Sequence, residues 1–364
     1  MKKLQGGYTM SSPKVSIIMP IYNASKFLRQ SLESLINQTL EDIEIICVND
    51  GSTDDSLSIM NEYALSDKRI KVIDKSNGGY GHSVNKGIQC STGGYIGILE
   101  PDDYAESTMY EELYQLAIDN HADVVKSNYY EYKRNENSSL VYESLHDLPY
   151  NKVFKANDYP SIFYVRPSVW SAIYKKSFLE ENHICFNETS GASYQDTGFA
   201  FKVWASAGRI YLIKNAYIHY AIDNDNSSVK SVGKIFSVCD EMHGIESYLN
   251  EDIEMKKSFS KYLQSVKLDT YYWNLCRISD EYKDYFKDVI GFEFLKAEYD
   301  GFLDKEVLGE ERWKILEPIL ESYRHHSEIN DLKKTYDQVI QSKSYKVGTA
   351  IMTIPSKIKN LTKK

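Results

Sequence analysis

The chain has 364 residues, of which 42% are apolar and 13% aromatic, enough for a large hydrophobic core and more than one domain. Its formal net charge of −9 argues against a protein that binds nucleic acid through a basic surface. No apolar run reaches the roughly 20 residues that span a bilayer, and the N-terminus lacks the apolar core of a secretory signal. We therefore expect a cytoplasmic protein without a nucleic-acid partner.

The cysteines and the charge of the C-terminal residues indicate the cellular compartment of the protein and its possible contacts. The five cysteines are scattered without a CxxC pair, which is typical of reduced thiols and argues against a disulfide framework or a structural zinc site. Residues 342–364 hold six lysines and no acidic residue, whereas the rest of the chain is acidic. Because apolar residues recur there at helical spacing, this tail has two interpretations. It is a peripheral contact to the inner face of a membrane, or a basic end packed on the acidic body.

The first part of the chain alternates strand and helix signals. Apolar runs predict strands at 14–23, 43–50, 70–74, 94–100 and 122–133. Helix patterns follow the first two strands, at 25–38 and 51–64, and a glycine-rich stretch at 77–88 that leads into a helix follows the third. Ser52 and Asp55 have the spacing of a capping box for the second of these helices. Such alternation predicts βαβ units, a mainly parallel sheet and an α/β fold.

The pattern loosens after about residue 134 and becomes helical towards the C-terminus. A helix is expected at 194–207, and from about 235 to 340 the chain reads as helical and rich in tyrosine. The predicted parts are an N-terminal extension at 1–13, an α/β domain at 14–230, a helical extension at 231–341 and the basic tail at 342–364. The helical extension shapes a second substrate site or an oligomer interface, and the sequence leaves both open.

The residues that follow each predicted strand are candidates for a ligand site. In open α/β sheets, ligands bind beyond the carboxyl ends of the strands. Tyr22 offers a flat face for a base or sugar, and Asp50 offers an acceptor for a ring N–H or a ribose hydroxyl. Gly79 lies in a glycine-rich turn that lets the backbone approach a ligand, and Asn85 and Lys86 follow within reach of a base or phosphate. Taken singly, each has a plain alternative as core, turn or cap.

Acidic residues crowd the end of the fourth strand, where "YIGILEPDDY" carries Glu100, Asp102 and Asp103. Like charges so close together repel unless something positive lies among them. Carboxylates are the ligands that Mg²⁺ and Mn²⁺ prefer, and such a cation bridges to a diphosphate. The alternative is a solvated turn in which Asp102 or Asp103 caps a helix. Since four successive strand ends carry such residues, the sequence favours a nucleotide-diphosphate site.

Four motifs, in order and at suitable spacing, resemble family 2 glycosyltransferases of the GT-A fold. They are "VSIIMPIYNASKFLRQSLESLINQTLEDIEIICVNDGSTDDS", "NGGYGHSVNKGI", "GGYIGILEPDDY" and "YQDTGFAFKVW", within about residues 14–230. The resemblance implies a Rossmann-like sheet flanked by helices. It also implies transfer of a sugar from a nucleotide donor, usually UDP-linked, to a hydroxyl of a glycan or lipid-linked acceptor, with inversion at the anomeric carbon.

The resemblance also assigns site residues. The nucleotide-sugar site would include Pro20, Ile21, Tyr22, Asn23, Asp50, Gly79, Asn85, Lys86, Glu100 and Asp103. The sequence "EPD" stands where the family keeps its DxD motif, so Asp102 matches the acid that holds Mn²⁺ or Mg²⁺ at the diphosphate. Glu100 replaces the family's first Asp and is longer by one methylene, which alters the ribose or metal contact there.

Two further residues are assigned in the same way. Asp196 in "YQDTG" matches the catalytic base, which the family usually precedes with Glu and this chain with Gln195. An inverting transfer needs such a base to take the proton of the acceptor hydroxyl. His219 is a second candidate metal ligand, and packing within a strand is its alternative.

Two other functional classes remain open from the sequence. A sugar-nucleotide nucleotidyltransferase also combines an α/β nucleotide site with carboxylate-held Mg²⁺, but its N-terminal glycine-rich loop is missing from "IYNASKF". A non-catalytic sugar- or nucleotide-binding protein is favoured only by Glu100 and Gln195, and the presence of Asp102 and Asp196 argues against it.

Overall fold

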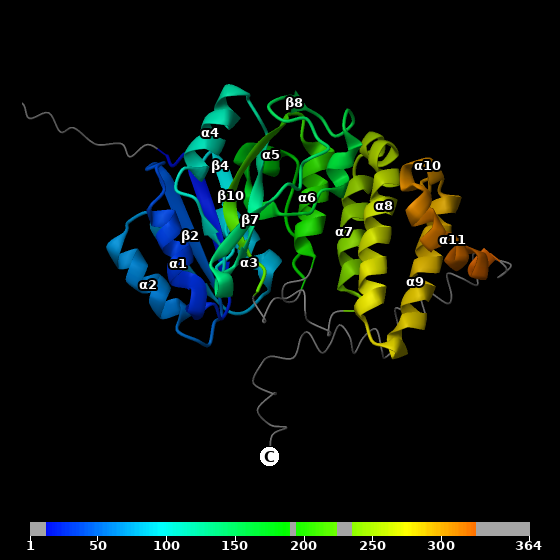
Figure 1. Cartoon of the computed structure of the whole chain (residues 1–364), viewed down its shortest axis with the longest axis horizontal. Helices are drawn as coiled ribbons and strands as arrows, with labels where there is room; N and C mark the ends of the chain where they lie inside the picture. Colours follow the sequence, from blue (N-terminus) through cyan, green and yellow to red (C-terminus); the bar gives the residue numbers. More distant parts are fainter. Residues whose placement is uncertain (1–11, 190–193, 224–234, 325–364) are drawn as a thin grey trace, which may run out of the picture.

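The computed structural model describes residues 12–189, 194–223 and 235–324 (Figure 1). The predicted basic tail at 342–364 and nearly all of the N-terminal extension at 1–13 lie outside the described residues. So does the end of the helical extension. The expectations for those segments stay predictions.

A single mixed sheet forms the centre of the α/β part. Its strands are β1 (Val15–Ile21), β2 (Ile43–Asp50), β3 (Ile70–Lys75), β4 (Tyr95–Ile98), β5 (Tyr104–Ala105), β6 (Val124–Lys133), β7 (Ser138–Tyr142), β8 (Val153–Phe154), β9 (Ala172–Lys175) and β10 (Ile210–Ala221). Along the sheet the order is β3-β2-β1-β4-β9-β6-β10-β5, with β7 on β6 and β8 on β10. The first four strands of this order are parallel, while β9 runs antiparallel to both of its neighbours.

Burial explains why the first strands read as continuous apolar runs. Every residue of β1 and β2 is buried, as expected for strands covered on both faces by helices. Helix α1 (Ser25–Ile36) places Leu28, Leu32 and Leu35 on one buried face. Helices α2 (Ser56–Ser66), α3 (Tyr80–Cys90) and α4 (Met109–Asp119) follow in the same α/β part, before the short α5 (Lys176–Glu181).

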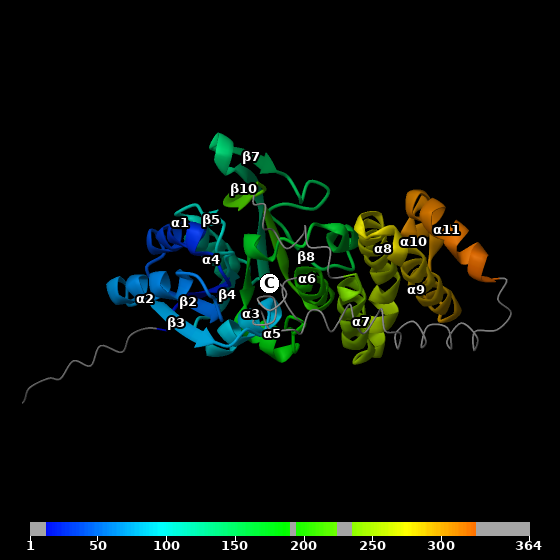
Figure 2. The ribbon, with the colours of Figure 1, turned by 90° about the horizontal axis from the view of Figure 1, so that it is seen from below.

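The C-terminal part is a block of helices beyond α6 (Gln195–Ser206). Its members are α7 (Ser237–Asn250), α8 (Ile253–Arg277), α9 (Asp280–Tyr299), α10 (Lys305–Leu308) and α11 (Glu310–Arg324). Figures 1 and 2 both show this block at one end of the molecule, with α6 between it and the sheet. No helix among the described residues combines the length and the apolar character needed to cross a bilayer.

The structure confirms the predicted fold class and corrects one local detail. The five strands predicted from apolar runs correspond to β1, β2, β3, β4 and β6, and the helix predicted at 194–207 is α6. The capping box was wrong: α2 begins only at Ser56, and the side chain of its N-cap residue, Asp55, makes no capping hydrogen bond. Instead the Ser52 hydroxyl accepts a hydrogen bond from the Asn23 amide, which ties the β1 turn to the β2 turn.

Candidate active site

The carboxyl ends of four parallel neighbours, β3, β2, β1 and β4, lie along one edge of the sheet. Pro20 and Ile21 are buried in the last residues of β1, whereas Tyr22 is 48% exposed directly after the strand. Asn23 has a φ of 51°, a left-handed conformation that asparagine tolerates better than most residues. Its side-chain oxygen accepts a hydrogen bond from the Thr53 amide at 2.7 Å, so the turns after β1 and β2 are held together.

Asp50, the last residue of β2, organises the glycine-rich turn. Its carboxylate accepts hydrogen bonds from the amides of Gly78 and Gly79 at 2.8 and 3.0 Å and forms an ion pair with Lys75. Gly79 has a φ of 91°, which favours glycine because an L side chain is strained there. The backbone of this turn is thus fixed by a nearly buried carboxylate. The contact of Asp50 with a base remains a prediction. Both carboxylate oxygens already accept hydrogen bonds from the protein.

Glu100 lies at the end of β4 and faces the start of α3. The Tyr80 hydroxyl donates a hydrogen bond to Glu100 Oε1 at 2.7 Å. Burial, together with the charges of Asp102 and Asp196, raises the pKa of Glu100 to about 8, although the hydrogen bond from Tyr80 opposes the rise. A carboxyl with that pKa is largely protonated at neutral pH, so the negative charge at this strand end is smaller than the sequence implies.

The other two acids differ in their surroundings. Asp103 is buried: its Oδ1 accepts a hydrogen bond from the Ala221 amide at 2.8 Å, and no described residue partners its Oδ2. Burial raises the pKa of Asp103 well above its ordinary range. Asp102 is half-buried, and its backbone carbonyl accepts a hydrogen bond from Arg134, which also stacks on Phe27 with 4.1 Å to the ring centroid. Arg134 is therefore a positive group within the acidic turn, one that sequence reasoning missed.

The oxygen donors of these acids suit a hard divalent cation. The number of protein ligands is sufficient only if a bound substrate supplies further ligands. Among the described residues, no group of three His, Cys, Asp or Glu side chains is placed to hold a metal ion. Magnesium is commonly bound through one or two carboxylates plus substrate phosphates, which needs no larger protein cluster. The turn after β4, with half-buried Asp102 and the unpartnered oxygen of Asp103, matches that arrangement.

Asp196 lies in the first turn of α6. Its Oδ1 accepts a hydrogen bond from the Thr197 amide at 2.8 Å, and the preceding N-cap residue, Tyr194, has a φ of 58°. Burial raises the pKa of Asp196 to about 6, while the Thr197 amide and the charge of Arg166 oppose the rise. Arg166 itself donates a hydrogen bond to the Tyr129 hydroxyl at 3.0 Å and lies over the Tyr220 ring. An aspartate of this pKa is ionised at neutral pH and remains basic enough to accept a proton.

Electrostatic coupling connects Asp196 with the end of β4. The charge of Asp196 raises the pKa values of Glu100 and Tyr80, although 96 residues separate Glu100 from Asp196 in the sequence. Carboxyl groups whose surroundings push their pKa values apart are typical of sites that divide proton-transfer and charge-holding roles. The fold therefore brings together the predicted base and the acidic strand end.

Glu241 on α7 is a further acid that sequence reasoning missed. It is fully buried and accepts a hydrogen bond from Asn187 Nδ2 at 2.8 Å. Burial raises its pKa to about 8, Lys202 opposes the rise, and the charge of Asp196 adds to it. Gln195, which replaces the family's Glu, donates a hydrogen bond to Thr189 Oγ1 at 2.7 Å. Only a three-dimensional contact between α6 and α7 could reveal Glu241, because nothing in the α7 sequence marks it.

Two predicted residues are occupied by protein contacts. Asn85 bridges to the segment after α5, exchanging hydrogen bonds of 2.9 Å with the amide and carbonyl of Phe186. Lys86 bonds to Gln89 on its own helix. Nothing in this arrangement directs either residue to a nucleotide.

His219 does not have the surroundings of a metal ligand. Its Nε2 bonds to Glu106 at 2.7 Å, its Nδ1 bonds to Ser139 at 2.8 Å, and its ring stacks between Tyr104 and Tyr130. With both ring nitrogens engaged, neither is left to coordinate a metal. The structure therefore supports the packing alternative for His219, because β10 places it inside an aromatic stack.

Comparison with known proteins identifies the family of the chain. A family model described as glycosyl transferase family 2 matches residues 16–181. The glycosyltransferase GlyG of Streptococcus pneumoniae is 31% identical over 219 residues, which cover 57% of this chain and 71% of GlyG. The chain belongs to glycosyl transferase family 2. The predicted family is thereby confirmed.

Two further comparisons bear on fold and extent. The uncharacterized glycosyltransferase EpsJ of Bacillus subtilis is 33% identical over 59% of this chain, and the match spans 62% of EpsJ. A crystal structure of S. aureus TarS 1-349 in complex with UDP-GlcNAc superposes with a TM-score of 0.66 at 22% identity, covering 86% of this chain and 92% of TarS 1-349. This likeness confirms the GT-A-type architecture, and it extends past the residues matched by the family model.

Proposed function

We propose that the protein is a metal-dependent inverting glycosyltransferase that moves a sugar from a UDP-linked donor to a hydroxyl of a glycan or lipid-linked acceptor. One observation carries this proposal: Asp196, ionisable with a pKa of about 6, is electrostatically coupled to the acidic end of β4. Family membership and the UDP-GlcNAc complex of TarS, a protein of the same fold, support the class of donor.

The donor site in this proposal lies along the carboxyl ends of β1 to β4. Tyr22 and the turn organised by Asp50 and Gly79 would receive the base and ribose, because they combine an exposed ring with ordered backbone amides. Asp102, with its neighbours Asp103 and Glu100, would hold Mn²⁺ or Mg²⁺ together with the diphosphate. When bound, the cation supplies positive charge that stabilises the leaving nucleotide.

The chemical step assigned to Asp196 is a proton transfer. Its carboxylate takes the proton of the acceptor hydroxyl while the acceptor oxygen forms a bond to the anomeric carbon. The bond from that carbon to the diphosphate oxygen breaks on the opposite face, and its electron pair leaves with UDP, which inverts the configuration. The Thr197 amide and the charge of Arg166 both oppose the effect of burial on the Asp196 pKa, which favours the ionised form that accepts the proton.

The test is a product analysis with UDP-GlcNAc and UDP-glucose in the presence of Mn²⁺. The proposal predicts that the wild type releases UDP. It also predicts that Asp196→Asn lowers this rate by about 10²–10⁴-fold while still binding UDP. Asp119→Asn, at an exposed position at the end of α4, is the matched control and should act as wild type. Formation of UTP and a sugar 1-phosphate when pyrophosphate is added to the UDP-sugar, without release of UDP, would identify a nucleotidyltransferase. An unchanged rate in Asp196→Asn would remove Asp196 from the mechanism.

A further inference from the structure

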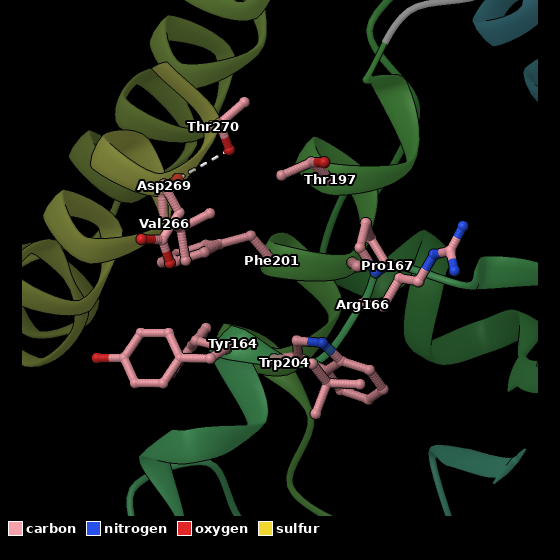
Figure 3. Close-up of a pocket in the computed structure, with 12 residues that line it drawn as sticks. Tyr164, Arg166, Pro167, Thr197, Phe201, Trp204, Val266, Asp269 and Thr270 are labelled. Atoms are coloured by element: carbon pink, nitrogen blue, oxygen red, sulfur yellow. Dashed lines mark hydrogen bonds between the residues drawn. The ribbon is translucent and has the colours of Figure 1, made fainter. Parts of the chain in front are cut away.

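A cavity of about 160 Å³ lies beside the predicted base, between α6 and the first long helix of the helical block (Figure 3). Thr197, Phe201 and Trp204 line it from α6, and Val266, Asp269 and Thr270 line it from α8. A single water molecule needs only about 10–15 Å³ of such cavity volume, so the cavity is large enough for a ligand group of many atoms.

The cavity adjoins Asp196 in both sequence and space. Thr197 is the next residue, and Ala200, also in the lining, lies one helical turn beyond Asp196 on the same stripe of α6. Arg166, whose charge acts on Asp196, lines the cavity from the other side. A group bound between α6 and α8 therefore contacts the residue that follows Asp196 and the residue one turn beyond it (Figure 3).

One face of α8 extends this surface. Trp273 lies four residues after Asp269 and three after Thr270, and Arg277 lies four after Trp273, so these side chains neighbour one another along the helix. Trp273 is 43% exposed and meets the Tyr194 ring edge to face at 5.8 Å, two residues before Asp196. Arg277 covers both rings, with 4.6 Å to the Trp273 centroid. The exposed indole of Trp273 thus packs on Tyr194, two residues before Asp196, and the Arg277 guanidinium lies over its ring.

The polar groups of the cavity are oriented from the helical block. The Asp269 carboxylate is held in a two-point ion pair by Arg312 of α11, at 2.8 and 2.7 Å, and Arg312 also lies over the Tyr164 ring. The Thr270 hydroxyl donates to the Val266 carbonyl at 2.8 Å, which leaves its lone pairs to accept a hydrogen bond. Fixed oxygen acceptors next to aromatic faces suit a sugar ring, which presents hydroxyl groups at its edge and C–H groups on its faces.

We propose that this cleft binds a pyranose ring of the acceptor, and that the Thr270–Trp273 face of α8 determines which acceptor is recognised. The inference rests on the proposed glycosyltransferase function and assigns to the helical block a share in the acceptor site. The donor site along β1 to β4 contains none of these α8 residues, so the two sites can be altered separately.

The test measures donor and acceptor binding on the same full-length variants. Saturation-transfer NMR with p-nitrophenyl β-glucoside and p-nitrophenyl β-N-acetylglucosaminide reports the acceptor site, and calorimetry with UDP and Mn²⁺ reports the donor site. Thr270→Val and Trp273→Ala should each weaken binding of the glycoside that the wild type binds, by about five- to tenfold, and leave the UDP affinity within about twofold. Tyr299→Ala, at an exposed tyrosine on α9, is the aromatic control and should change neither.

The outcomes separate this inference from the proposed function. If the wild type binds UDP and neither glycoside binds, or if both α8 variants bind glycoside as wild type does, the acceptor assignment is wrong while the donor site stands. An equal loss of UDP and glycoside binding in the α8 variants, with thermal unfolding unchanged, would also overturn it. Failure of the wild type to bind UDP would contradict the proposed function itself.

Discussion

Replacing Asp196 by Asn should stabilise the protein at neutral and alkaline pH. An aspartate in the unfolded chain loses its proton near the ordinary value of 3.8, whereas in the folded protein burial raises the Asp196 pKa to about 6. Between these values the folded state binds more protons than the unfolded state, so the stability falls as the pH rises. The shift of roughly two units corresponds to about 3 kcal/mol once both states are ionised. This loss of stability follows from keeping a buried carboxylate ionised, which the proposed role of Asp196 as the base requires.

Urea unfolding of wild type and Asp196→Asn measures this effect. The linkage relation gives a stability gain for the variant of about 3 kcal/mol at about pH 8, falling to about 1.6 kcal/mol at about pH 5. The Thr197 amide keeps its acceptor, because the asparagine carbonyl oxygen replaces Oδ1. A gain that is independent of pH, or a loss of stability at about pH 8, would refute the account of the Asp196 pKa.

Glu44→Gln is the control of opposite sign. Glu44 is buried, and its pKa is lowered to about 2, because hydrogen bonds from Lys71, Ser16 and Thr92 outweigh the effect of burial. Its ionised form therefore stabilises the fold above the unfolded pKa, and this stabilisation is lost as the pH falls towards 2. The variant should be less stable than wild type at about pH 8, with a difference that narrows in acid.

Three further predictions concern the surroundings of Asp196 and a buried lysine of the sheet. Arg166→Met should move the acid limb of the kcat/KM profile, expected near pH 6, to higher pH, because the guanidinium opposes the rise of the Asp196 pKa; an unmoved limb would contradict this. Glu241 has a pKa of about 8 and is therefore mostly neutral at neutral pH, so the neutral Glu241→Gln should change kcat/KM by less than about threefold. Glu241→Ala should lower the unfolding free energy by about 2 kcal/mol. Lys126 donates three buried hydrogen bonds to Ser168 and Ser171, so Lys126→Met should lower the urea midpoint by a change corresponding to about 2 kcal/mol; an unchanged midpoint would show that these bonds contribute nothing.

The local signals in the sequence account for the architecture of the first half. The runs predicted at 14–23 and 43–50 correspond to β1 and β2, because strands buried on both faces need continuous apolar sequence. The run at 70–74 corresponds to β3, which is only partly buried. By contrast, β9 has only four residues and inserts antiparallel between β4 and β6. Such a short run carries no signal that distinguishes it from a loop, so its place in the sheet could not be predicted.

The site was predictable where function lies at strand ends and unpredictable where it depends on distant contacts. Asp50 is the last residue of β2 and Glu100 lies two residues beyond β4, so the sheet alone brings them to one edge. Glu241 and Arg166 act on or with Asp196 through packing between elements far apart in sequence, which no spacing rule reveals. For His219 the sequence pattern was ambiguous. A histidine in a strand has the same sequence pattern whether it coordinates a metal or stacks between tyrosines.

The most direct test of the central claim is a calorimetric titration of UDP, with and without Mn²⁺, into wild type and Asp102→Asn. The account predicts that UDP binds the wild type in the presence of Mn²⁺. It also predicts that Asp102→Asn weakens this binding by at least about tenfold, because the cation at the diphosphate loses its carboxylate. Equal UDP binding by both proteins, independent of Mn²⁺, would contradict a metal site at Asp102, and no UDP binding by the wild type would contradict the donor site itself.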